Sequence, residues 1–335
     1  MHRVSTFCNN METINWGIIG CGNVTEKKSG PAFNKVFNSS LVAVMRRDAE
    51  KAADYAARHK VGAWYSDAGE MMRDERLNAI YIATPPASHT EYAIEALSKG
   101  FNVYVEKPVT RNAAEARQIA EALRLYPEQK LTVAHYRRGV PMFLKVKELL
   151  ESKLIGDIRT VQIRMWKYRK TQSAEALAAN WRLHPELSGG GYFHDLAPHQ
   201  LDLMLFFFGE PEKYSGFSLN QSGDSAADDN VQGQILFKNG VVVSGSWCFN
   251  VAESEAIDSC EIIGTNGKIT FPFFGNFIHW KTDEDEQTLD FVHPEHIQQP
   301  MITKIVSYFR GEGPNPCSID EAIVLMDIMD AFTKK

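Results

Sequence analysis

Short apolar runs alternate with amphipathic segments in the first part of the chain. The runs are rich in Val, Ile and Tyr and apolar at nearly every position, which is typical of strands covered on both faces. They occupy residues 14–19, 41–45, 79–84, 102–106 and 131–136. Helical patterns lie between them, over residues 48–59, 88–100 and 110–126. This alternation predicts a parallel sheet with right-handed crossover helices.

The pattern changes after residue 136. A helix is expected over 141–154, a long strand over 158–168 and, after a glycine-rich segment, a helix over about 194–208. Several strands then follow in succession, which predicts an antiparallel or mixed sheet. These strands are expected at residues 212–219, 230–238, 241–250, 259–264, 268–271 and 277–281.

Capping and turn residues mark several ends of these elements. Asp48 and Thr110 begin two helical patterns, and Gly100 follows the end of another. The turn 238–240 joins two strands as a hairpin. Two helices close the chain, and the last one begins at Ser318 with a glutamate three residues later, which is a capping-box pattern.

The change of pattern divides the 335 residues into two α/β parts. Residues 13–136 are predicted to form a doubly wound parallel sheet domain, and residues 137–335 a second α/β domain with a mixed or antiparallel sheet. Residues 1–12 are expected to be a flexible N-terminal extension, in which Met11 is an alternative start.

Composition narrows the class of protein. The net charge of −6 argues against a nucleic-acid partner, which needs a basic surface. The five cysteines are scattered and form no C-x-x-C pair, so we expect no zinc or other metal site and reduced thiols in the cytoplasm. The most apolar run, 203–208, is too short to cross a membrane, and no signal peptide is evident at the N-terminus.

The first strand runs into a glycine-rich turn. Gly20, Gly22, Asn23, Val24 and Thr25 form a G-x-G-x-x-T pattern after a strand and before a helix. In that context the glycines allow a tight turn and the close approach of a pyrophosphate to the helix N-terminus. The alternative is a tight turn without a ligand.

The second strand ends in two arginines. A carboxylate is usual at this position in NAD-dependent enzymes, but here Arg46 occupies it, followed by Arg47, while Asp48 is expected to cap the next helix. A guanidinium suits a 2′-phosphate, so the sequence predicts a preference for NADP(H), with NAD(H) still possible. The alternative is a pair of solvated arginines.

Two further motifs follow the fourth and fifth strands. The segment 83–89 contains Ala83, Thr84, Pro85 and His89, and the segment 106–108 contains Glu106 and Lys107. Both lie at carboxyl ends of parallel strands, the rim where ligands bind in this architecture. Lys107 follows a buried strand, so it is a candidate for polarising a carbonyl, although an ordinary turn is the alternative.

The glycine-rich segment of the second part leads into two further candidates. Asp195 and His199 are spaced i and i+4, which places them on one face of a helix. A carboxylate beside an imidazole can orient the ring and raise its pKa for acid–base work. A capping aspartate with a surface histidine is the alternative. Asp202 comes three residues after His199, on a similar face of the predicted helix. It is either a second partner at this site or a structural residue.

Taken together, these motifs resemble those of the glucose–fructose oxidoreductase, inositol dehydrogenase and rhizopine-catabolism (Gfo/Idh/MocA) family. The matching stretches are GIIGCGNVT at 17–25, ATPPASH at 83–89, EKPV at 106–109 and GGGYFHDLAPHQLD at 189–202. Their order agrees over nearly the whole chain. VTEKKSGPAF at 24–33 and NWRLHPELSGGG at 180–191 are similar to the branch of 1,5-anhydro-D-fructose reductases, which use NADPH.

The resemblance implies a Rossmann domain followed by an α/β domain with a large open sheet, with substrate bound between them. It implies that Lys107, Asp195 and His199 are catalytic and that Trp181 and Arg182 approach the cofactor or substrate. It also implies a homodimer or homotetramer formed through the C-terminal sheet. The expected reaction is hydride transfer between nicotinamide and a sugar or polyol, with His199 handling the proton, Asp195 orienting its imidazole and Lys107 polarising the oxygen.

Other functions remain open from the sequence. An NAD-dependent inositol or sugar dehydrogenase is the nearest, and the arginines after the second strand speak against it. A nucleotide-sensing regulator without catalysis would not need all three catalytic candidates, and a purely structural protein would not need the glycines. The sugar itself is not evident. Candidate specificity groups are Trp166, Tyr168, Arg169 and the segment 293–299.

Overall fold

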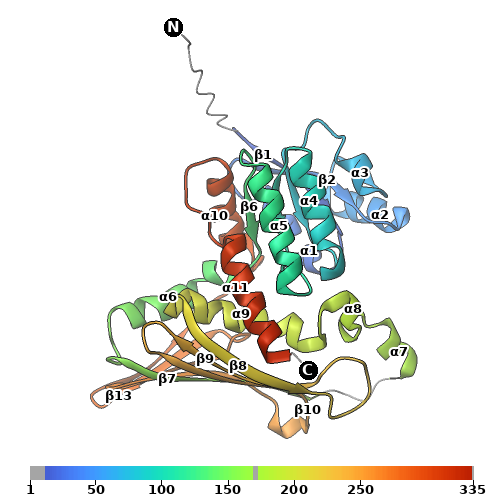
Figure 1. Cartoon of the computed structure of the whole chain (residues 1–335). Coiled ribbons are helices and arrows are strands. Elements are labelled where there is room, and N and C mark those ends of the chain that lie inside the picture. The colour runs from blue at the N-terminus through green and yellow to red at the C-terminus, as the bar shows by residue number, and fades with distance from the viewer. Residues whose placement is uncertain (1–11, 169–172, 334–335) are drawn as a thin grey trace.

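The computed structural model describes residues 12–168 and 173–333 (Figure 1). The N-terminal extension expected over residues 1–12 lies outside these residues except for its last position, as does Arg169. The described chain forms two sheets, one in each half of the sequence.

The first sheet is parallel, with strand order β3-β2-β1-β4-β5-β6. This confirms the doubly wound arrangement predicted from the sequence. The strands are β1 (Ile14–Ile19), β2 (Ser39–Met45), β3 (Ala63–Tyr65), β4 (Ala79–Ile82), β5 (Asn102–Val105) and β6 (Leu131–Val133). The helices are α1 (Asn23–Lys27), α2 (Ala49–His59), α3 (Ala68–Met71), α4 (His89–Ser98) and α5 (Ala113–Leu125).

Capping follows the sequence at one helix and departs from it at another. The side chain of Asp48 accepts a hydrogen bond from the amide of Lys51 and caps α2, as predicted. The cap of α5 is Asn112 rather than Thr110, whose hydroxyl instead donates to the carbonyl of Asn112. The expectation for Thr110 was therefore wrong, because both residue types favour caps and the spacing did not distinguish them.

The second sheet is mixed, with strand order β14-β13-β12-β11-β7-β10-β9-β8. β7 and β10 pair in parallel, and the other neighbours pair antiparallel. The strands are β7 (Ile158–Tyr168), β8 (Pro211–Leu219), β9 (Asn230–Phe237), β10 (Val242–Val251), β11 (Ile257–Gly264), β12 (Gly267–Phe271), β13 (Phe277–Thr282) and β14 (Glu286–Asp290). The helices of this half are α6 (Pro141–Glu151), α7 (Ala174–Ala179), α8 (Pro185–Ser188), α9 (Gly191–Phe208), α10 (Gln299–Phe309) and α11 (Ile319–Thr333).

Alternation along β7 gives this sheet two different faces. Val161, Ile163 and Met165 are buried, whereas the intervening side chains are half-buried or exposed. Figure 1 shows α6 and α9 on the same side of the sheet, which is the face that buries the apolar side chains. The opposite face carries Trp166 and the exposed Phe217, on β7 and β8.

The last helix returns to the first domain and fixes the two halves against each other. The amide of Val133 on β6 donates to the carbonyl of Cys317, and the amide of Ala113 donates to the Asp330 carboxylate on α11. The start of α11 has the predicted capping box: Glu321 accepts from the Ser318 amide and donates its own amide to the Ser318 hydroxyl. Figure 1 shows α11 running from beside α5 towards the second sheet.

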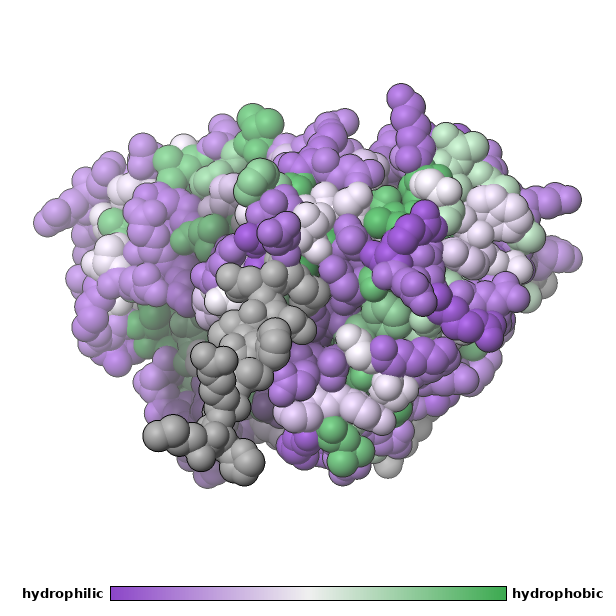
Figure 2. Space-filling view, turned by 90° about the horizontal axis from the view of Figure 1, so that it is seen from above, coloured by the Kyte–Doolittle hydropathy of each residue, from purple (hydrophilic) through white to green (hydrophobic). Residues whose placement is uncertain are grey.

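The surface seen in Figure 2, looking down on the first domain, is mainly hydrophilic with scattered hydrophobic side chains. Among the described helices, none is both long enough and apolar enough to traverse a lipid bilayer.

Candidate active site

A cavity of about 650 Å³ lies where the carboxyl ends of β1, β2, β4 and β5 meet α9. Its volume is in the range typical of small-molecule sites. Every residue predicted from the sequence to be catalytic or to bind the cofactor lines it, except His89. These residues are Gly20, Gly22, Asn23, Val24, Arg46, Arg47, Ala83, Thr84, Pro85, Glu106, Lys107, Trp181, Arg182, Asp195 and His199.

The glycine-rich turn is built for close backbone approach. Gly20 has φ of +92°, and a Cβ added there would lie 2.9 Å from the amide nitrogen of Thr84. A Cβ added at Gly22 would meet only one protein atom within 4 Å, the carbonyl oxygen of Gly20 at 3.9 Å. The room beside Gly22 therefore belongs to the cavity. Asn23 and Val24 follow at the start of α1, where backbone amides suit an anionic group, whereas the Thr25 amide donates to the Gly22 carbonyl at 3.0 Å.

Arg46 and Arg47 stand at the end of β2, on the wall of this cavity. Nη1 of Arg46 donates to the carbonyl of Cys21 at 3.3 Å, which holds the guanidinium against the glycine-rich turn. Asp48 also lines the cavity, but its carboxylate caps α2 and pairs with Lys51 at 2.8 Å. A carboxylate engaged in this way is not directed to a ribose.

His89 is the one candidate that does not line the cavity. Its side chain is fully buried, with Nε2 2.8 Å from the carbonyl oxygen of Thr84 and Nδ1 3.1 Å from that of Pro108. The expectation that His89 contacts the cofactor is therefore corrected. The imidazole instead joins the loops after β4 and β5 from behind, because their carbonyls are its only acceptors among the described residues.

Lys107, Asp195 and Arg182 form one charged group. Nζ of Lys107 donates to Oδ1 of Asp195 at 2.9 Å and to its backbone carbonyl at 2.8 Å. Nε of Arg182 donates to Oδ2 at 2.7 Å. Burial alone would raise the pKa of Asp195, but the two cations outweigh it and hold that pKa well below its usual range. The group therefore has one carboxylate between two cations.

The helix that carries Asp195 begins earlier in the chain than the sequence predicted. α9 begins at Gly191 rather than near residue 194, so Pro198 lies inside it and not in its first turn as expected. Proline has no amide hydrogen and crowds the carbonyl four residues earlier, which disturbs the helical hydrogen bonds at this level. Gly190 and Gly191 leave no side chain where His194 and Ala227 pack against the helix start.

Glu106 has a structural role beneath the cavity. Its buried carboxylate accepts from the Tyr81 hydroxyl at 2.5 Å, from the Gln298 side chain at 2.8 Å and from the Lys107 amide at 3.1 Å. These bonds fix the backbone at Lys107, and they connect β5 to the segment that precedes α10.

His199 differs from the sequence expectation in its partner. Its ring lines the cavity, but among the described residues Nδ1 has no hydrogen-bond partner, and the two oxygens of Asp195 accept from Lys107 and Arg182. The prediction that Asp195 orients the imidazole and raises its pKa is therefore wrong. Burial, followed by the charges of Lys107 and Arg137, lowers the pKa of His199 well below its usual value. The ring packs edge-on to Tyr136 and Phe274.

The cavity also contains residues that the sequence did not single out. They are Cys21, Lys28, Met45, Asp48, Pro86, Tyr92, Tyr136, Leu196, Phe274 and Gln298. Only Gln298 fell within a predicted specificity segment, 293–299. Phe274 follows β12 in a loop without a motif, and Lys28 follows α1 within the stretch 24–33, which the sequence analysis matched to a family branch without assigning Lys28 a role. Trp166 and Tyr168 do not line the cavity, and Nε1 of Trp166 donates to Ser246 at 2.9 Å.

Trp181 and Arg182 form a stacked pair at the cavity wall. The guanidinium carbon of Arg182 lies 4.7 Å from the centre of the Trp181 ring. Both residues belong to a short 3-10 helix, Trp181–Leu183, held by the Asn180 side chain at its start. Stacking and the bond to Asp195 together fix the orientation of the guanidinium.

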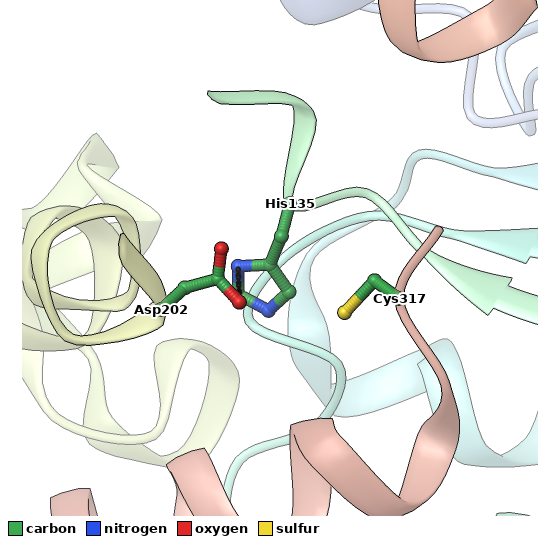
Figure 3. A group of neighbouring side chains, drawn as sticks. All are labelled: His135, Asp202 and Cys317. Carbon is green, nitrogen blue, oxygen red and sulfur yellow. Dashed lines mark ion pairs between the residues drawn. The ribbon is translucent and has the colours of Figure 1, made fainter. Parts of the chain in front are cut away.

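Outside this cavity, Figure 3 shows a trio of neighbouring side chains, all of them buried. His135, Asp202 and Cys317 come from three segments, and their ligand atoms lie within 4.8 Å of one another. Nε and Nη2 of Arg138 both donate to the Asp202 carboxylate, at 3.0 Å and 2.7 Å. The carboxylate is thus already neutralised by a guanidinium, which would repel a cation. We interpret the trio as part of a buried ion-pair network.

Comparison with known proteins gives matches over almost the whole chain. Residues 14–135 match the oxidoreductase family with the NAD-binding Rossmann fold, and residues 143–270 match the GFO/IDH/MocA C-terminal domain. Oxidoreductase P35 of Formosa agariphila is 48% identical over 319 residues, which cover 95% of this chain and 98% of that protein.

Other relatives are more distant. The 1,5-anhydro-D-fructose reductase of Ensifer adhaerens is 24% identical over 256 residues, covering 76% of this chain and 74% of the reductase. A solved structure of levoglucosan dehydrogenase in complex with NADH superposes with a TM-score of 0.85 at 21% identity, covering 96% of both chains. This likeness concerns the fold.

Proposed function

The chain belongs to the GFO/IDH/MocA family of oxidoreductases and binds NAD(P) through its Rossmann domain, and on this basis we propose that it transfers a hydride between NADP(H) and a sugar or polyol. The observation that carries the proposal is a single cavity. It is lined at one end by the Gly20–Gly22 turn and at the other by Lys107, Asp195 and His199. Dinucleotide recognition and proton-handling groups thus meet in one space.

The residues present suit NADP(H). Gly22 leaves room in the cavity where a side chain would otherwise stand, beside the start of α1. Arg46 and Arg47 supply two cations at the end of β2, and the carboxylate that an NAD ribose would require is engaged as a helix cap. Trp181 and Arg182 line the same cavity and complete the proposed cofactor site.

The nicotinamide supplies the hydride chemistry when it is bound. In the oxidising direction, the carbinol carbon of the substrate gives up a hydride while its hydroxyl proton passes to His199. In the reducing direction His199 returns that proton to the forming alkoxide. An imidazole with a lowered pKa is neutral at pH 7 and so can accept the proton.

Lys107 is proposed to hold and polarise the reacting oxygen. Its ammonium has one hydrogen bond to the Asp195 carbonyl and one to the carboxylate, which leaves one donor for the substrate. Asp195 is then a positioning residue for Lys107 and Arg182. This differs from the role predicted from the i, i+4 spacing, in which Asp195 orients the histidine.

The same proposal includes the organisation of the protein. We propose domains over residues 13–136 and 137–335, and a homodimer or homotetramer that covers the open face of the second sheet. The exposed Phe217 and Leu219 on the edge strand β8 support an interface on that face. Cys21, Cys248, Cys260 and Cys317 are free thiols, which supports a reducing, cytoplasmic location.

The test is a spectrophotometric assay of the purified protein with a panel of sugars and polyols. We expect oxidation of NADPH with a ketose or dicarbonyl sugar, and slower oxidation of NADH at the same concentration. An absence of turnover with either nucleotide, combined with binding of the nucleotide, would favour a nucleotide-sensing regulator. Equal kcat/KM for NADH would contradict the cofactor preference.

A further inference from the structure

Cations are concentrated around the inner end of the cavity. Lys107 and Lys28 line it, and Arg137 lies directly behind its wall. All three are close enough to His199 for their charges to disfavour its protonation. The chain as a whole carries a net charge of −6. The inner end is thus a local positive region in an acidic protein.

Phe274 is the centre of this region. The guanidinium carbon of Arg137 lies 4.3 Å from the centre of the Phe274 ring, and Nζ of Lys167 lies 5.3 Å from it. The ring is also 5.7 Å from that of His199, and 43% of the Phe274 residue surface is exposed. Lys167 shares a face of β7 with the buried Met165, so it projects on the side of the sheet that bears α9.

The carboxylates near these cations balance them only in part, because the charge of Asp258 acts on both Arg137 and Lys167 without forming an ion pair with either. Within the described part of the chain, no carboxylate oxygen lies within 4.0 Å of the charged nitrogens of Lys28, Arg137 or Lys167. Asp195 is already shared by Lys107 and Arg182. Asp258 accepts from the amides of residues 273 and 274, which positions the Phe274 loop.

The cofactor does not account for this charge. The proposed sites for its phosphates are the Gly20–Gly22 turn and the arginines after β2. Lys167 and Phe274 instead belong to β7 and to the loop after β12, in the second domain. An anionic partner stabilises a cation beside an apolar ring more strongly than it would in water, because the local dielectric constant is lower.

We infer that the substrate is an acidic carbohydrate, whose carboxylate or phosphate ester binds beside Phe274 to Lys28 and Lys167. The ring of Phe274 offers an apolar surface for the sugar, and Arg137 supports the ring from behind. This inference rests on the proposed function, since it names the substrate class of the same site. It places the reacting hydroxyl between His199 and Lys107, and the anionic group at the opposite end of the sugar.

The test compares matched ligands in the presence of NADP⁺. We would measure the affinities of glucuronate, glucose 6-phosphate and glucose by calorimetry and follow turnover of each. We expect at least one acidic ligand to bind about tenfold to a hundredfold more tightly than glucose, the effect of one or two hydrogen bonds to a charged group. Preference for glucuronate or for the phosphate ester identifies the anionic group. Equal affinity of glucose and both acidic ligands would overturn the inference.

The Lys167→Met variant separates charge recognition from general binding. It should weaken the acidic ligand about tenfold and leave glucose unchanged, whereas Lys213→Met on the edge strand β8 should change neither. If Lys167→Met does not fold, the same comparison of acidic ligand and glucose affinities would be made with Lys28→Met. Equal weakening of acidic and neutral ligands in the variant that folds would contradict the anionic subsite.

Binding and turnover can fail separately. If acidic ligands bind preferentially but neither they nor neutral sugars are turned over, the subsite stands and the proposed enzymatic function falls. If neutral sugars are turned over with NADPH as efficiently as acidic ones, the function stands and this inference falls.

Discussion

Nζ of Lys107 and Oδ1 of Asp195 lie 2.9 Å apart, although 88 residues separate them in the chain. Lys107 ends a strand of the first domain, and Asp195 lies near the start of the helix that crosses the second sheet. The ion pair therefore joins the two domains at the candidate site. Arg182 approaches the same carboxylate, so the loss of Asp195 would leave two cations facing each other.

Replacement of Lys107 by alanine should reduce kcat by about two to four orders of magnitude, the usual scale for groups that act directly on the reacting oxygen. NADPH affinity should change little, because Lys107 lies at the opposite end of the cavity from the glycine-rich turn. Stopped-flow turnover and fluorescence titration would measure the two quantities. Near-normal turnover in Lys107→Ala would end its assignment.

Asp195→Asn removes the charge while keeping the shape of the side chain. We expect kcat to fall about tenfold to a hundredfold, because Lys107 and Arg182 then lose the group that holds them. Asp327→Asn is the matched control, since Asp327 forms an exposed ion pair with Arg117 outside the cavity. The control should retain wild-type turnover, and an equal loss in both variants would point to instability.

The pH dependence of oxidation should report the low pKa of His199. The base form of the imidazole is required, and its pKa lies well below the ordinary 6.5. Activity should therefore be level through pH 7 and decline only as the pH falls through the lowered pKa. Lys28→Met removes one of the nearby cations, so it should raise that pKa and move the acidic limb of kcat/KM towards higher pH.

A pH–rate profile of the wild type and of Lys28→Met would measure the acidic limb of each protein. The His199→Ala variant should lack the acidic limb and lose about two to four orders of magnitude in turnover. A limb above pH 6.5 in the wild type would show that the imidazole is not the group that titrates.

The sequence predicted secondary structure well where its signals are local. The strands β1 and β7 were predicted at their observed bounds, since apolar periodicity and the flanking turns define them. β3 and β14 were missed, because both are short and lack an apolar run. The start of α9 was placed too late, since a run of glycines conceals where a helix begins.

The candidate site was predictable where a motif marked it and not elsewhere. The turn at Gly20 and Gly22 and the three proposed catalytic residues line one cavity. Contacts between side chains distant in the chain carried no such signal. Spacing put Asp195 beside His199, but it could not show that Lys107 and Arg182 would take both carboxylate oxygens. Phe274 could not be predicted either, because its place in the cavity depends on contacts between side chains distant in the chain.

Cofactor choice should depend on the two arginines after β2. Arg46→Ala and Arg47→Ala should each weaken NADPH binding about tenfold, the scale of one charge-assisted hydrogen bond, and leave NADH affinity nearly unchanged. Arg73→Ala, outside the cavity, is a control. Dissociation constants for both nucleotides, measured by fluorescence, would test this. Equal loss of NADPH and NADH affinity would assign the arginines to the shared part of the cofactor.

Gly20→Ala should weaken cofactor binding through a steric clash, in addition to the strain of a left-handed backbone. The new Cβ would lie 2.9 Å from the Thr84 amide nitrogen and 3.0 Å from the Ala83 carbonyl carbon, so the turn must move. Gly240→Ala is the matched control, because Gly240 also has a positive φ, +85°, but no atom lies within 4 Å of its added Cβ.

Both variants should lose about 1–2 kcal/mol of stability from the left-handed backbone, measured by denaturant unfolding. Only Gly20→Ala should also lose NADPH affinity, by tenfold or more on the scale of about 1.4 kcal/mol per decade. Wild-type affinity in Gly20→Ala would show that the turn is not the phosphate site.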